Sequence, residues 1–310
     1  MRVLITGAAG MLGSSLLRTL SKRPEFDVLG LTRNDLDLRE KSEFQKVLID
    51  FKPDAVIHTA AKVGGIQANL AGPVDFLAAN LQMDSNVITT SLEQAIENFI
   101  YVGSSCMYPK DFRQPLQETD LLMGPLEPTN EGYALAKIAG SKLCEYASNS
   151  LSVKYRTIIP SNLYGPGDNF EPASSHLLSS VIRKVHEAKL AGLPTINVWG
   201  SGRARREFTY IDDLASWVGE MLPRIGDLPP RLNVGIGVDY SVNEFYQTAL
   251  SALGVDADLV HDLAKPEGMK VKLMDSSLAR AEFGWNPKTD LATGIRKTYE
   301  WYFEKTRGGE

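Results

Sequence analysis

The chain has 310 residues, of which 43% are hydrophobic and 23% are charged, a balance that is typical of a folded globular protein and excludes a disordered or fibrous chain. Its 33 basic and 38 acidic side chains give a formal charge of −5, so no overall positive charge attracts nucleic acid or an anionic membrane surface. Two cysteines cannot form a disulfide framework, and because no Cys/His cluster has the spacing of a zinc site, we expect no metal centre.

The chain starts with an apolar stretch, residues 3–13, that superficially imitates a signal peptide. Gly7, Gly10 and Gly13 interrupt this stretch, whereas the apolar region of a signal peptide is continuous, so we interpret it as folded structure. No apolar run approaches the roughly 20 residues that a membrane-spanning helix needs. Together with the absence of a disulfide framework, these features predict a cytoplasmic protein.

Short apolar runs then alternate with longer helical patterns through the first half of the chain. The predicted strands are residues 2–6, 27–32, 55–59, 99–102 and 156–159, and residues 11–21 form the first predicted helix. Apolar runs of this length, separated by helical periodicity, indicate a parallel sheet buried on both faces, because parallel strands need helical crossovers. The predicted fold is α/β, a Rossmann-like doubly wound parallel sheet.

The second half changes character after Tyr164, with a turn-rich stretch at residues 167–175 and a predicted helix at about 176–191. Shorter elements follow, which is more typical of a cap than of a second sheet domain. We expect a cofactor-binding domain of residues 1–165 with a return segment of about 207–237. A smaller substrate-binding lobe would then comprise about residues 166–206 and 238–310.

The first predicted strand leads into a glycine-rich loop. Gly7, Gly10 and Gly13 lie at the junction of strand and helix, where bare backbone N–H groups and the helix dipole can bind a pyrophosphate. The spacing is G-x-x-G-x-x-G rather than the G-x-G-x-x-G of ordinary dinucleotide-binding folds, so the fingerprint is only partly met. A glycine turn used only for tight packing is the alternative, but the flanking strand and helix favour a dinucleotide site.

The end of the second predicted strand bears on the choice of cofactor. An NAD site would place Asp or Glu there for the ribose 2′-hydroxyl, but this chain has Thr32-Arg33. A guanidinium at this position complements the 2′-phosphate of NADP through charge-assisted hydrogen bonds. We therefore favour NADP(H), although Asp35 or Asp37 could still approach the ribose and Arg33 could be a solvated surface residue.

A Tyr and a Lys lie four residues apart at Tyr133 and Lys137, which places them on one face of a helix. A nearby ammonium favours the phenolate, so we expect Lys137 to lower the Tyr133 pKa and make the phenol a usable acid and base. An isolated pair of this kind is often a chance surface pair. Ser104, which follows a predicted strand at the sheet edge where ligands bind, makes a chance pair less probable. Cys144 continues the same helix face and is most simply a core residue.

These segments together resemble the extended short-chain dehydrogenase/reductase superfamily, through TGAAGMLG at 6–13, Ser104 and YALAK at 133–137. The resemblance is closest to the GDP-L-fucose synthase family and runs nearly end to end. It is found in HTAAKVGGI at 58–66, GSSCMYPK at 103–110, LEPTNEGYALAKIAGSKLCE at 126–145, PSNLYGPGDNF at 160–170, SHLL at 175–178 and WGSGRARREF at 199–208. Members of that family take GDP-4-keto-6-deoxy-D-mannose, invert C3″ and C5″, and then reduce the C4″ ketone with NADPH.

The resemblance implies a role for each catalytic candidate. Cys106 and His176 would be the base and the acid of the two inversions, since a 4-keto group acidifies the hydrogens on both neighbouring carbons. Tyr133 would then give a proton to the C4″ oxygen, Ser104 would hydrogen-bond that oxygen, and Lys137 would steady Tyr133 and the nicotinamide ribose. A buried, inert thiol is the alternative for Cys106, and a helix-capping or packing side chain is the alternative for His176.

The resemblance also implies the binding residues. The cofactor contacts would be Gly7, Gly10, Met11, Leu12, Gly13, Arg33, Ala60, Ala61, Val102, Gly103, Lys137, Pro160, Asn162, Leu163 and His176. The substrate contacts would be Lys184, Trp199, Arg206 and Asp275, with Arg206 on the diphosphate. Lys184 stands where the family has an Arg, so it keeps the charge and loses the bidentate geometry. His58 is interpreted as a structural histidine, and Arg203 and Arg205 as surface charges.

Other functions remain open. A 4,6-dehydratase or a UDP-sugar 4-epimerase shares the fold and the Tyr/Lys pair, but Ser105-Cys106-Met107 stands where a dehydratase has an acidic pair. An epimerase/reductase of another GDP-4-keto sugar, of colitose or deoxyheptose type, would use the same Cys and His. A non-catalytic NADP-binding sensor or scaffold is a further alternative. The superfamily resemblance also implies a homodimer formed through the predicted helices near residues 73–96 and 131–148.

Overall fold

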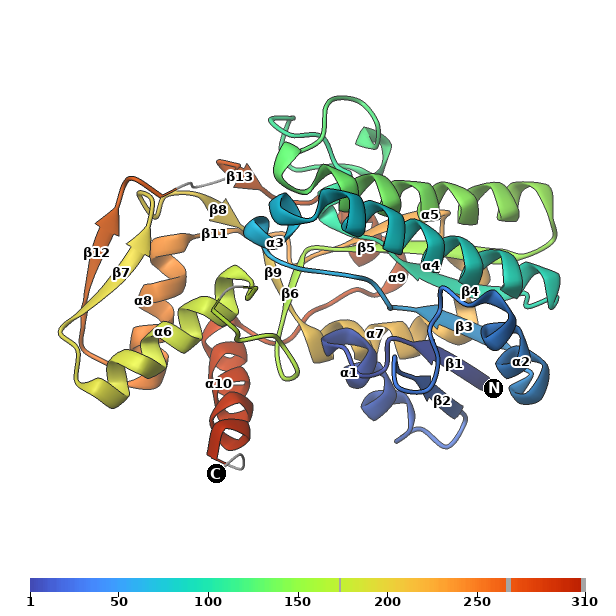
Figure 1. Cartoon of the computed structure of the whole chain (residues 1–310), viewed down its shortest axis with the longest axis horizontal. Coiled ribbons are helices and arrows are strands. Elements are labelled where there is room, and N and C mark those ends of the chain that lie inside the picture. Colours follow the sequence, from blue (N-terminus) through green and yellow to red (C-terminus); the bar gives the residue numbers. More distant parts are fainter. Residues whose placement is uncertain (173, 266–268, 308–310) are drawn as a thin grey trace.

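A six-stranded parallel sheet forms the centre of the larger part of the molecule (Figure 1). The computed structural model describes residues 1–172, 174–265 and 269–307. The strand order is β10-β5-β4-β3-β1-β2, and every neighbouring pair is parallel. The strands are β1 (Arg2–Thr6), β2 (Asp27–Leu31), β3 (Ala55–His58), β4 (Asn98–Val102), β5 (Lys154–Pro160) and β10 (Arg231–Val234). The predicted α/β fold with a doubly wound parallel sheet is confirmed.

Helices cover both faces of this sheet, as the alternation of apolar side chains along each strand requires. Leu4 and Val56 pack toward one face, whereas Val3, Ile5 and Ile57 pack toward the other. The helices on the first face are α2 (Lys41–Phe51), α4 (Pro73–Glu93) and α5 (Glu131–Ser150). Those on the second are α1 (Met11–Leu20), α7 (Ile211–Met221) and α9 (Ser277–Phe283). In Figure 1, α4 and α5 lie side by side toward the top of the sheet part, and α1 and α7, which contact each other, lie lower down.

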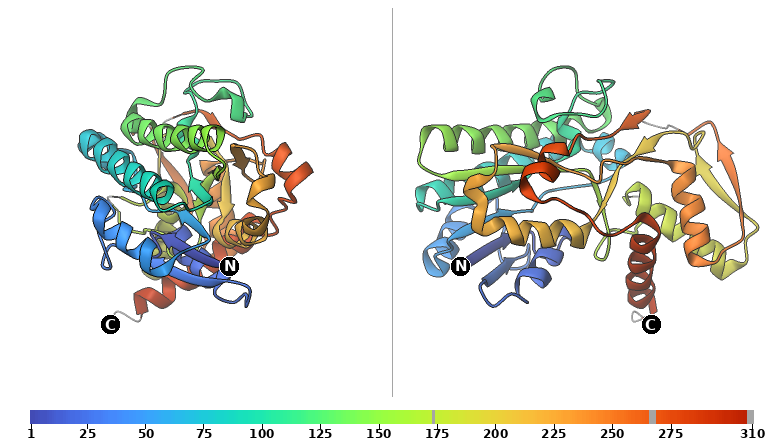
Figure 2. Two further views of the ribbon diagram at one scale, coloured as in Figure 1. Left: turned by 90° about the vertical axis from the view of Figure 1, so that its right-hand side faces the viewer. Right: turned by 180° about the vertical axis from the view of Figure 1, so that it is seen from behind.

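A second hydrophobic core lies beyond the carboxyl ends of the strands, on the left of Figure 1. It is built from α6 (Leu177–Ala191), α8 (Val242–Leu253) and α10 (Leu291–Arg307), together with the parallel pair β7 (Thr195–Trp199) and β12 (Asp258–Asp262). Seen from behind, this part projects from one end of the sheet (Figure 2). It is smaller than the sheet part, as predicted for the second half.

Short elements connect the two parts. β6 (Asn162–Tyr164) pairs with β9 (Phe208–Tyr210), and β8 (Arg205–Arg206) lies between β11 (Tyr240–Ser241) and β13 (Val271–Lys272). α3 (Ile66–Ala71) and the 3-10 helices η1 (Ser105–Met107), η2 (Glu118–Asp120), η3 (Pro128–Asn130) and η4 (Leu222–Asp227) complete the structure. In the described residues, no helix is long and apolar enough to cross a membrane.

Residues 238–310 were expected to belong to the substrate-binding lobe, but one segment of them packs in the sheet part instead. Ala279 and Phe283 of α9, and Trp285 after it, are buried in the core beneath the sheet. The indole of Trp217 in α7 donates a hydrogen bond to the Phe283 carbonyl at 2.8 Å and packs edge-on against Trp285. The segment returns to the sheet part because its large apolar side chains fill the space between α7 and β10.

Candidate active site

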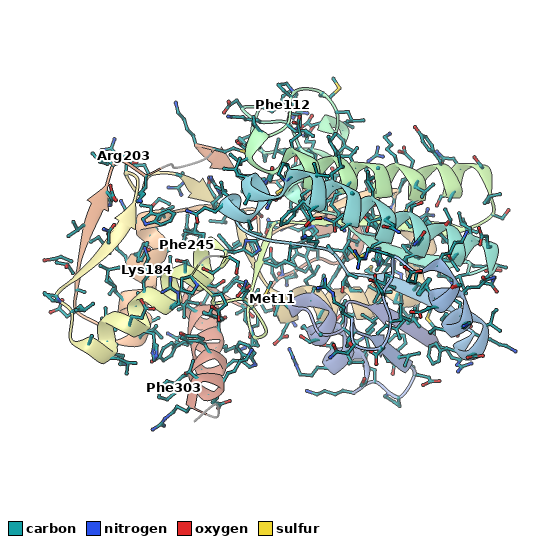
Figure 3. All side chains as sticks on the ribbon, viewed as in Figure 1. Met11, Phe112, Lys184, Arg203, Phe245 and Phe303 are labelled. Atoms are coloured by element: carbon teal, nitrogen blue, oxygen red, sulfur yellow. The ribbon has the colours of Figure 1, made fainter. Side chains whose placement is uncertain are left out.

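A cavity of about 770 Å³ lies between the two parts, at the carboxyl ends of the parallel strands. Ligands of open α/β sheets bind at this edge, because the loops that leave the strands diverge there. Met11, at the start of α1, lies on the sheet side of the cavity, and Lys184 lies in the second part (Figure 3). Every predicted site residue except Asp275 lines this one cavity.

The glycine loop between β1 and α1 provides one end of the cavity. Gly7 has φ +73°, and a Cβ atom there would lie 2.7 Å from the backbone of Ala60, so only glycine fits. α1 starts after Gly10 without a side-chain cap, which leaves the first N–H groups of the helix available to an anion. The loop thus fits a pyrophosphate.

The cofactor-binding candidates are distributed around this end. Besides the glycines, they are Met11, Leu12, Ala60, Ala61, Val102, Gly103, Pro160, Asn162 and Leu163, and all of them border the cavity. Pro160 is the last residue of β5, and Asn162 is the first residue of β6. Their backbones come together because parallel strands present their carboxyl ends at the same edge.

Arg33 lines the cavity from the end of β2 and is exposed. The two acidic alternatives nearby are engaged elsewhere. The Asp35 carboxylate accepts hydrogen bonds from the backbone and the hydroxyl of Thr32, both at 2.7 Å. Asp37 is bound by Arg39, whose hydrogen bonds lower the Asp37 pKa to about 2. The cationic Arg33, rather than a free carboxylate, is therefore available at this end of the cavity.

Tyr133 and Lys137 project from the same face of α5 into the cavity, and Ser104 follows β4 beside them. The expected effect of Lys137 on Tyr133 was wrong. Burial raises the Tyr133 pKa, as do the nearby Cys106 and Asp84, whereas a hydrogen bond with Ser104 opposes the rise. Asp84 lies 3.8 Å from the Lys137 ammonium and offsets its charge. A protonated phenol is the form that a proton donor needs.

Cys106 is half-buried in η1 and reaches the cavity. The Asn130 amide donates a hydrogen bond to its sulfur at 3.1 Å, and the Lys272 ammonium lies 3.5 Å from the same atom. Hydrogen-bond donors and a cation stabilise negative charge on sulfur. This environment differs from that of Cys144, which is fully buried in the core, as predicted.

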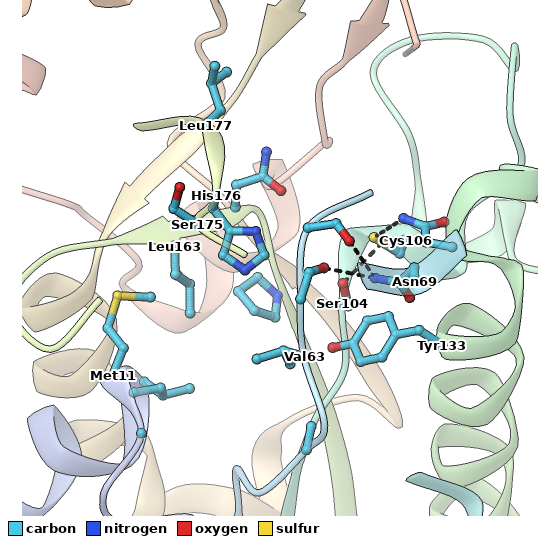
Figure 4. Close-up of a pocket in the computed structure, with 18 of the residues that line it drawn as sticks. Met11, Val63, Asn69, Ser104, Cys106, Tyr133, Leu163, Ser175, His176 and Leu177 are labelled. Atoms are coloured by element: carbon cyan, nitrogen blue, oxygen red, sulfur yellow. Dashed lines mark hydrogen bonds between the residues drawn. The ribbon is translucent and has the colours of Figure 1, made fainter. Parts of the chain in front are cut away.

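His176 faces this group from the opposite wall (Figure 4). It occupies the N-cap position of α6, but its side chain makes no capping hydrogen bond, so the helix-capping alternative is not supported. The ring points into the cavity toward Ser104, Cys106 and Tyr133, while Leu163 lies beneath it. A six-membered ring placed between these walls would have a thiol on one side and an imidazole on the other.

The predicted substrate residues separate into two groups. Lys184, Trp199 and Arg206 line the cavity, and the Lys184 ammonium lies 5.7 Å from the centre of the Trp199 ring, whereas Arg206 is paired with Lys272 beside Cys106. Asp275 does not belong there. Its carboxylate accepts hydrogen bonds from Gln117 at 3.2 Å and from the Ser277 backbone at 3.0 Å, and it borders a separate, smaller hollow. Asp275 thus lies just before α9 and outside the main cavity, so its contact with substrate stays a prediction.

Comparison with known proteins places this geometry in a family. Residues 3–235 match the model of the NAD dependent epimerase/dehydratase family. The chain belongs to this family.

Two curated relatives match the chain over almost their whole length. A GDP-L-colitose synthase of Yersinia pseudotuberculosis is 42% identical over 98% of this chain and 99% of its own. A GDP-L-fucose synthase of Azorhizobium caulinodans is 43% identical over 97% and 96%. Among solved structures, a GDP-mannoheptose C4 reductase of Campylobacter jejuni with NADP bound has a TM-score of 0.88 at 31% identity, covering 97% of this chain and 98% of that one.

Several residues that line the cavity were not predicted from the sequence. Asn130 lies three residues before Tyr133, within the segment that carries the resemblance, so its position gave a usable signal. Lys272 gave none, because β13 brings it to Cys106 from 166 residues away. Within the described parts of the chain, no group of three or more His, Cys, Asp or Glu side chains could hold a metal ion.

Proposed function

We propose that the protein is an NADPH-dependent 3,5-epimerase and 4-ketoreductase that converts GDP-4-keto-6-deoxy-D-mannose to GDP-L-fucose. The curated GDP-L-fucose synthases at 42–43% identity support the substrate. The observation that carries the proposal is the single cavity in which Cys106 and His176 face each other beside Tyr133. A plain reductase needs only the phenol, whereas an epimerase also needs an acid and a base on opposite faces of the ring.

The cofactor fits the residues at the glycine-loop end. The cradle at Gly7 and the uncapped N-terminus of α1 suit a pyrophosphate, and the exposed Arg33 suits a 2′-phosphate. When bound, NADPH supplies the hydride for the ketone. In this proposal the Lys137 side chain holds the nicotinamide ribose, and its position in the cavity one helical turn beyond Tyr133 supports that role.

The epimerisation is assigned to the residues that face each other. The Cys106 thiolate removes the proton from the carbon beside the ketone, and the electron pair passes to the ketone oxygen as an enolate. His176 then donates a proton to the opposite face of that carbon, which inverts it. Asn130 and Lys272 contact the sulfur and stabilise its charge before the proton moves. The same steps apply to the carbon on the other side of the ketone.

Reduction follows with a different set of side chains. Tyr133 gives its proton to the ketone oxygen as hydride arrives at the carbon, and Ser104 hydrogen-bonds the same oxygen. The raised pKa of Tyr133 keeps this proton in place until charge develops on the oxygen. Arg206 and Lys184, which both line the cavity, hold the diphosphate.

A second candidate substrate is another GDP-4-keto sugar, and the curated GDP-L-colitose synthase at 42% identity favours it. NADPH oxidation with GDP-4-keto-6-deoxy-D-mannose and with the 4-keto precursors of colitose and deoxyheptose type, followed by NMR of the products, decides between them. We expect GDP-L-fucose as the preferred product. Binding of NADPH without turnover of any of these sugars would favour a non-catalytic sensor instead.

We also propose a cytoplasmic homodimer that pairs through α4 and α5. Leu81 on α4 and Leu135 and Tyr146 on α5 are exposed apolar side chains, with Tyr146 60% exposed, and such a surface is stabilised when a partner covers it. Sedimentation at micromolar concentration is expected to give twice the mass of one chain, and the mass of a single chain would contradict the dimer.

We further propose that residues 1–165 with 207–237 bind the cofactor, and that the remaining segments, apart from α9, bind the sugar nucleotide.

A further inference from the structure

A buried cluster of polar side chains lies directly beneath the cavity, and the mechanism above uses only one of them. Asp84 of α4 and Lys137 of α5 are 1% and 2% exposed, and His58 of β3 and Tyr101 of β4 are fully buried. Lys137 lines the cavity, but Asp84 does not. Burial of charged groups is costly unless they are paired and hydrogen-bonded, so this cluster needs an explanation.

The Asp84 carboxylate is held by two strands at once. Its Oδ1 accepts a hydrogen bond from His58 Nε2 at 2.9 Å, and its Oδ2 accepts one from the Tyr101 hydroxyl at 2.5 Å. Because a carboxylate only accepts, His58 carries its proton on Nε2, and its Nδ1 accepts from the Thr6 hydroxyl at 2.6 Å. Burial lowers the His58 pKa, so this ring is neutral. The carboxylate cannot rotate without breaking these bonds.

The Lys137 ammonium depends on this fixed carboxylate. Its Nζ lies 3.8 Å from Asp84 Oδ1 and 4.6 Å from the centre of the Tyr101 ring. Burial lowers the Lys137 pKa, and the charge of Asp84 opposes that effect. Among the residues that the structure describes, Asp84 is the one carboxylate within ion-pair distance of this ammonium. The other titratable groups near the pair are Tyr133 and Cys144 of α5, and burial raises the pKa of both, so neither carries a charge at neutral pH.

We propose that Asp84, fixed by His58 and Tyr101, is a positioning residue that holds the Lys137 ammonium at the floor of the cofactor pocket. The assignment rests on the proposed function, because it is the nicotinamide ribose and Tyr133 that Lys137 would serve. Asp84 contacts neither and acts through Lys137. Without the carboxylate, the ammonium either loses its proton or turns toward the open cavity, and in both cases the ribose is misplaced.

The test is Asp84→Asn, which keeps the shape of the side chain and removes its charge. We expect the Kd for NADPH to rise about tenfold and kcat of ketone reduction to fall up to about 100-fold, as for other small displacements of a positioned group. The pH at which kcat declines on the alkaline side should move down by about one unit, because Lys137 loses its counter-charge. A purely structural role for Asp84 would lower stability without moving this pH.

Ser91→Ala is the matched control, because the Ser91 hydroxyl is fully buried in the same helix and donates to the Val87 carbonyl within α4 rather than to Asp84. It should leave the Kd, kcat and pH profile unchanged. Wild-type values of all three in a folded Asp84→Asn variant would overturn the proposal. If that variant does not fold, Tyr101→Phe replaces it, since it removes one hydrogen bond to Asp84 and is expected to give a smaller shift of the same pH limb and about a threefold rise in Kd; an unchanged profile and Kd would again overturn it.

The NADPH titration separates this proposal from the proposed function. If the wild type turns over none of the GDP-4-keto sugars, the proposed function fails, but the Kd of Asp84→Asn relative to wild type still tests the placement of Lys137. If the wild type is active and Asp84→Asn binds NADPH and reduces ketone normally, the proposed function stands and the positioning role is wrong.

Discussion

The two walls of the cavity are built in different ways. On the sheet side, Ser104 follows the buried strand β4, and Tyr133 and Lys137 extend from a helix of 20 residues above buried polar side chains. On the other side, Arg206 and Lys272 belong to paired strands of two residues each, and His176 lies at the first residue before a helix. In the proposed mechanism, the sheet-side wall supports proton donation to a ketone, a step that is the same for every sugar. In the same proposal, the wall of short elements contacts the groups by which sugar nucleotides differ.

The largest effect is expected on the sheet-side wall. Tyr133→Phe removes the proton donor, so NADPH-dependent reduction should fall by about 10²- to 10⁴-fold, which is the usual contribution of general acid catalysis. Exchange of the C3″ and C5″ hydrogens in D₂O, followed by NMR, should persist because it depends on Cys106 and His176. Normal NADPH consumption by this variant would overturn the reductive assignment.

Cys106→Ser tests the proposed base of the epimerisation. A hydroxyl is a much weaker base than a thiolate at neutral pH, so deuterium uptake at C3″ and C5″ should fall by about 100-fold or more. Some ketone reduction should remain, because Tyr133 is intact. Cys144→Ala is the control, since this buried thiol lies in the core. If Cys106→Ser still exchanges both positions at the wild-type rate, the base lies elsewhere.

Arg33→Ala sharpens the assignment of the cofactor end. Loss of a charge-assisted contact with the 2′-phosphate should raise KM for NADPH about tenfold and leave KM for NADH unchanged. The matched control is Arg39→Ala, because the Arg39 guanidinium is bound to Asp37 at 3.0 Å. Steady-state kinetics with both cofactors make the measurement. Equal changes for NADPH and NADH would remove Arg33 from the 2′-phosphate site.

The smallest expected effect is on the pH dependence of folding stability. It comes from Glu207, which connects the short elements of the second wall. Its carboxylate accepts hydrogen bonds from the backbones of Gly237 at 2.6 Å and Met274 at 3.0 Å, and burial raises its pKa from 4.5 to about 7. Between these pH values the folded protein holds a proton that the unfolded chain has lost. Stability should therefore fall as pH rises from about 5 to 7, by up to about 1.4 kcal/mol per unit from this group.

Urea unfolding at pH 5, 6 and 7 measures this dependence. Glu207→Gln cannot ionise, so its free energy of unfolding should decline less steeply over the same range than that of the wild type, even though the variant is less stable at pH 5. Parallel curves for the two proteins would show that Glu207 is ionised in the folded state at pH 5.

The difference between the two walls also explains which residues of the site could be predicted from the sequence. The glycine loop, Ser104 and the Tyr133–Lys137 face follow from local spacing, because a strand and a helix place neighbouring residues by fixed geometry. The direction of the Tyr133 pKa was not predictable in this way. It depends first on burial, and then on Cys106 and on Asp84, which α4 brings to Lys137 from 53 residues earlier in the chain.

The second wall depends on contacts between distant segments. Asp275 lies three residues after the short strand β13 and was expected beside the substrate, but its carboxylate accepts a hydrogen bond from Gln117 and it borders a separate hollow. α9 was assigned to the second part by its place in the sequence, yet Trp285 packs beneath the sheet. In both cases tertiary packing, rather than periodicity or residue type, decides the position.

The alternating path of the chain has a consequence for engineering. After β5 the chain passes to α6, returns to α7 and β10, passes again to α8, returns to α9 and ends in α10. No single junction divides the gene into two exchangeable modules, so grafting a foreign sugar-binding half onto this scaffold would require several simultaneous splices. A library that aims at new sugar nucleotides is better directed at point substitutions in β8, β13 and the residues around His176 than at recombination of halves.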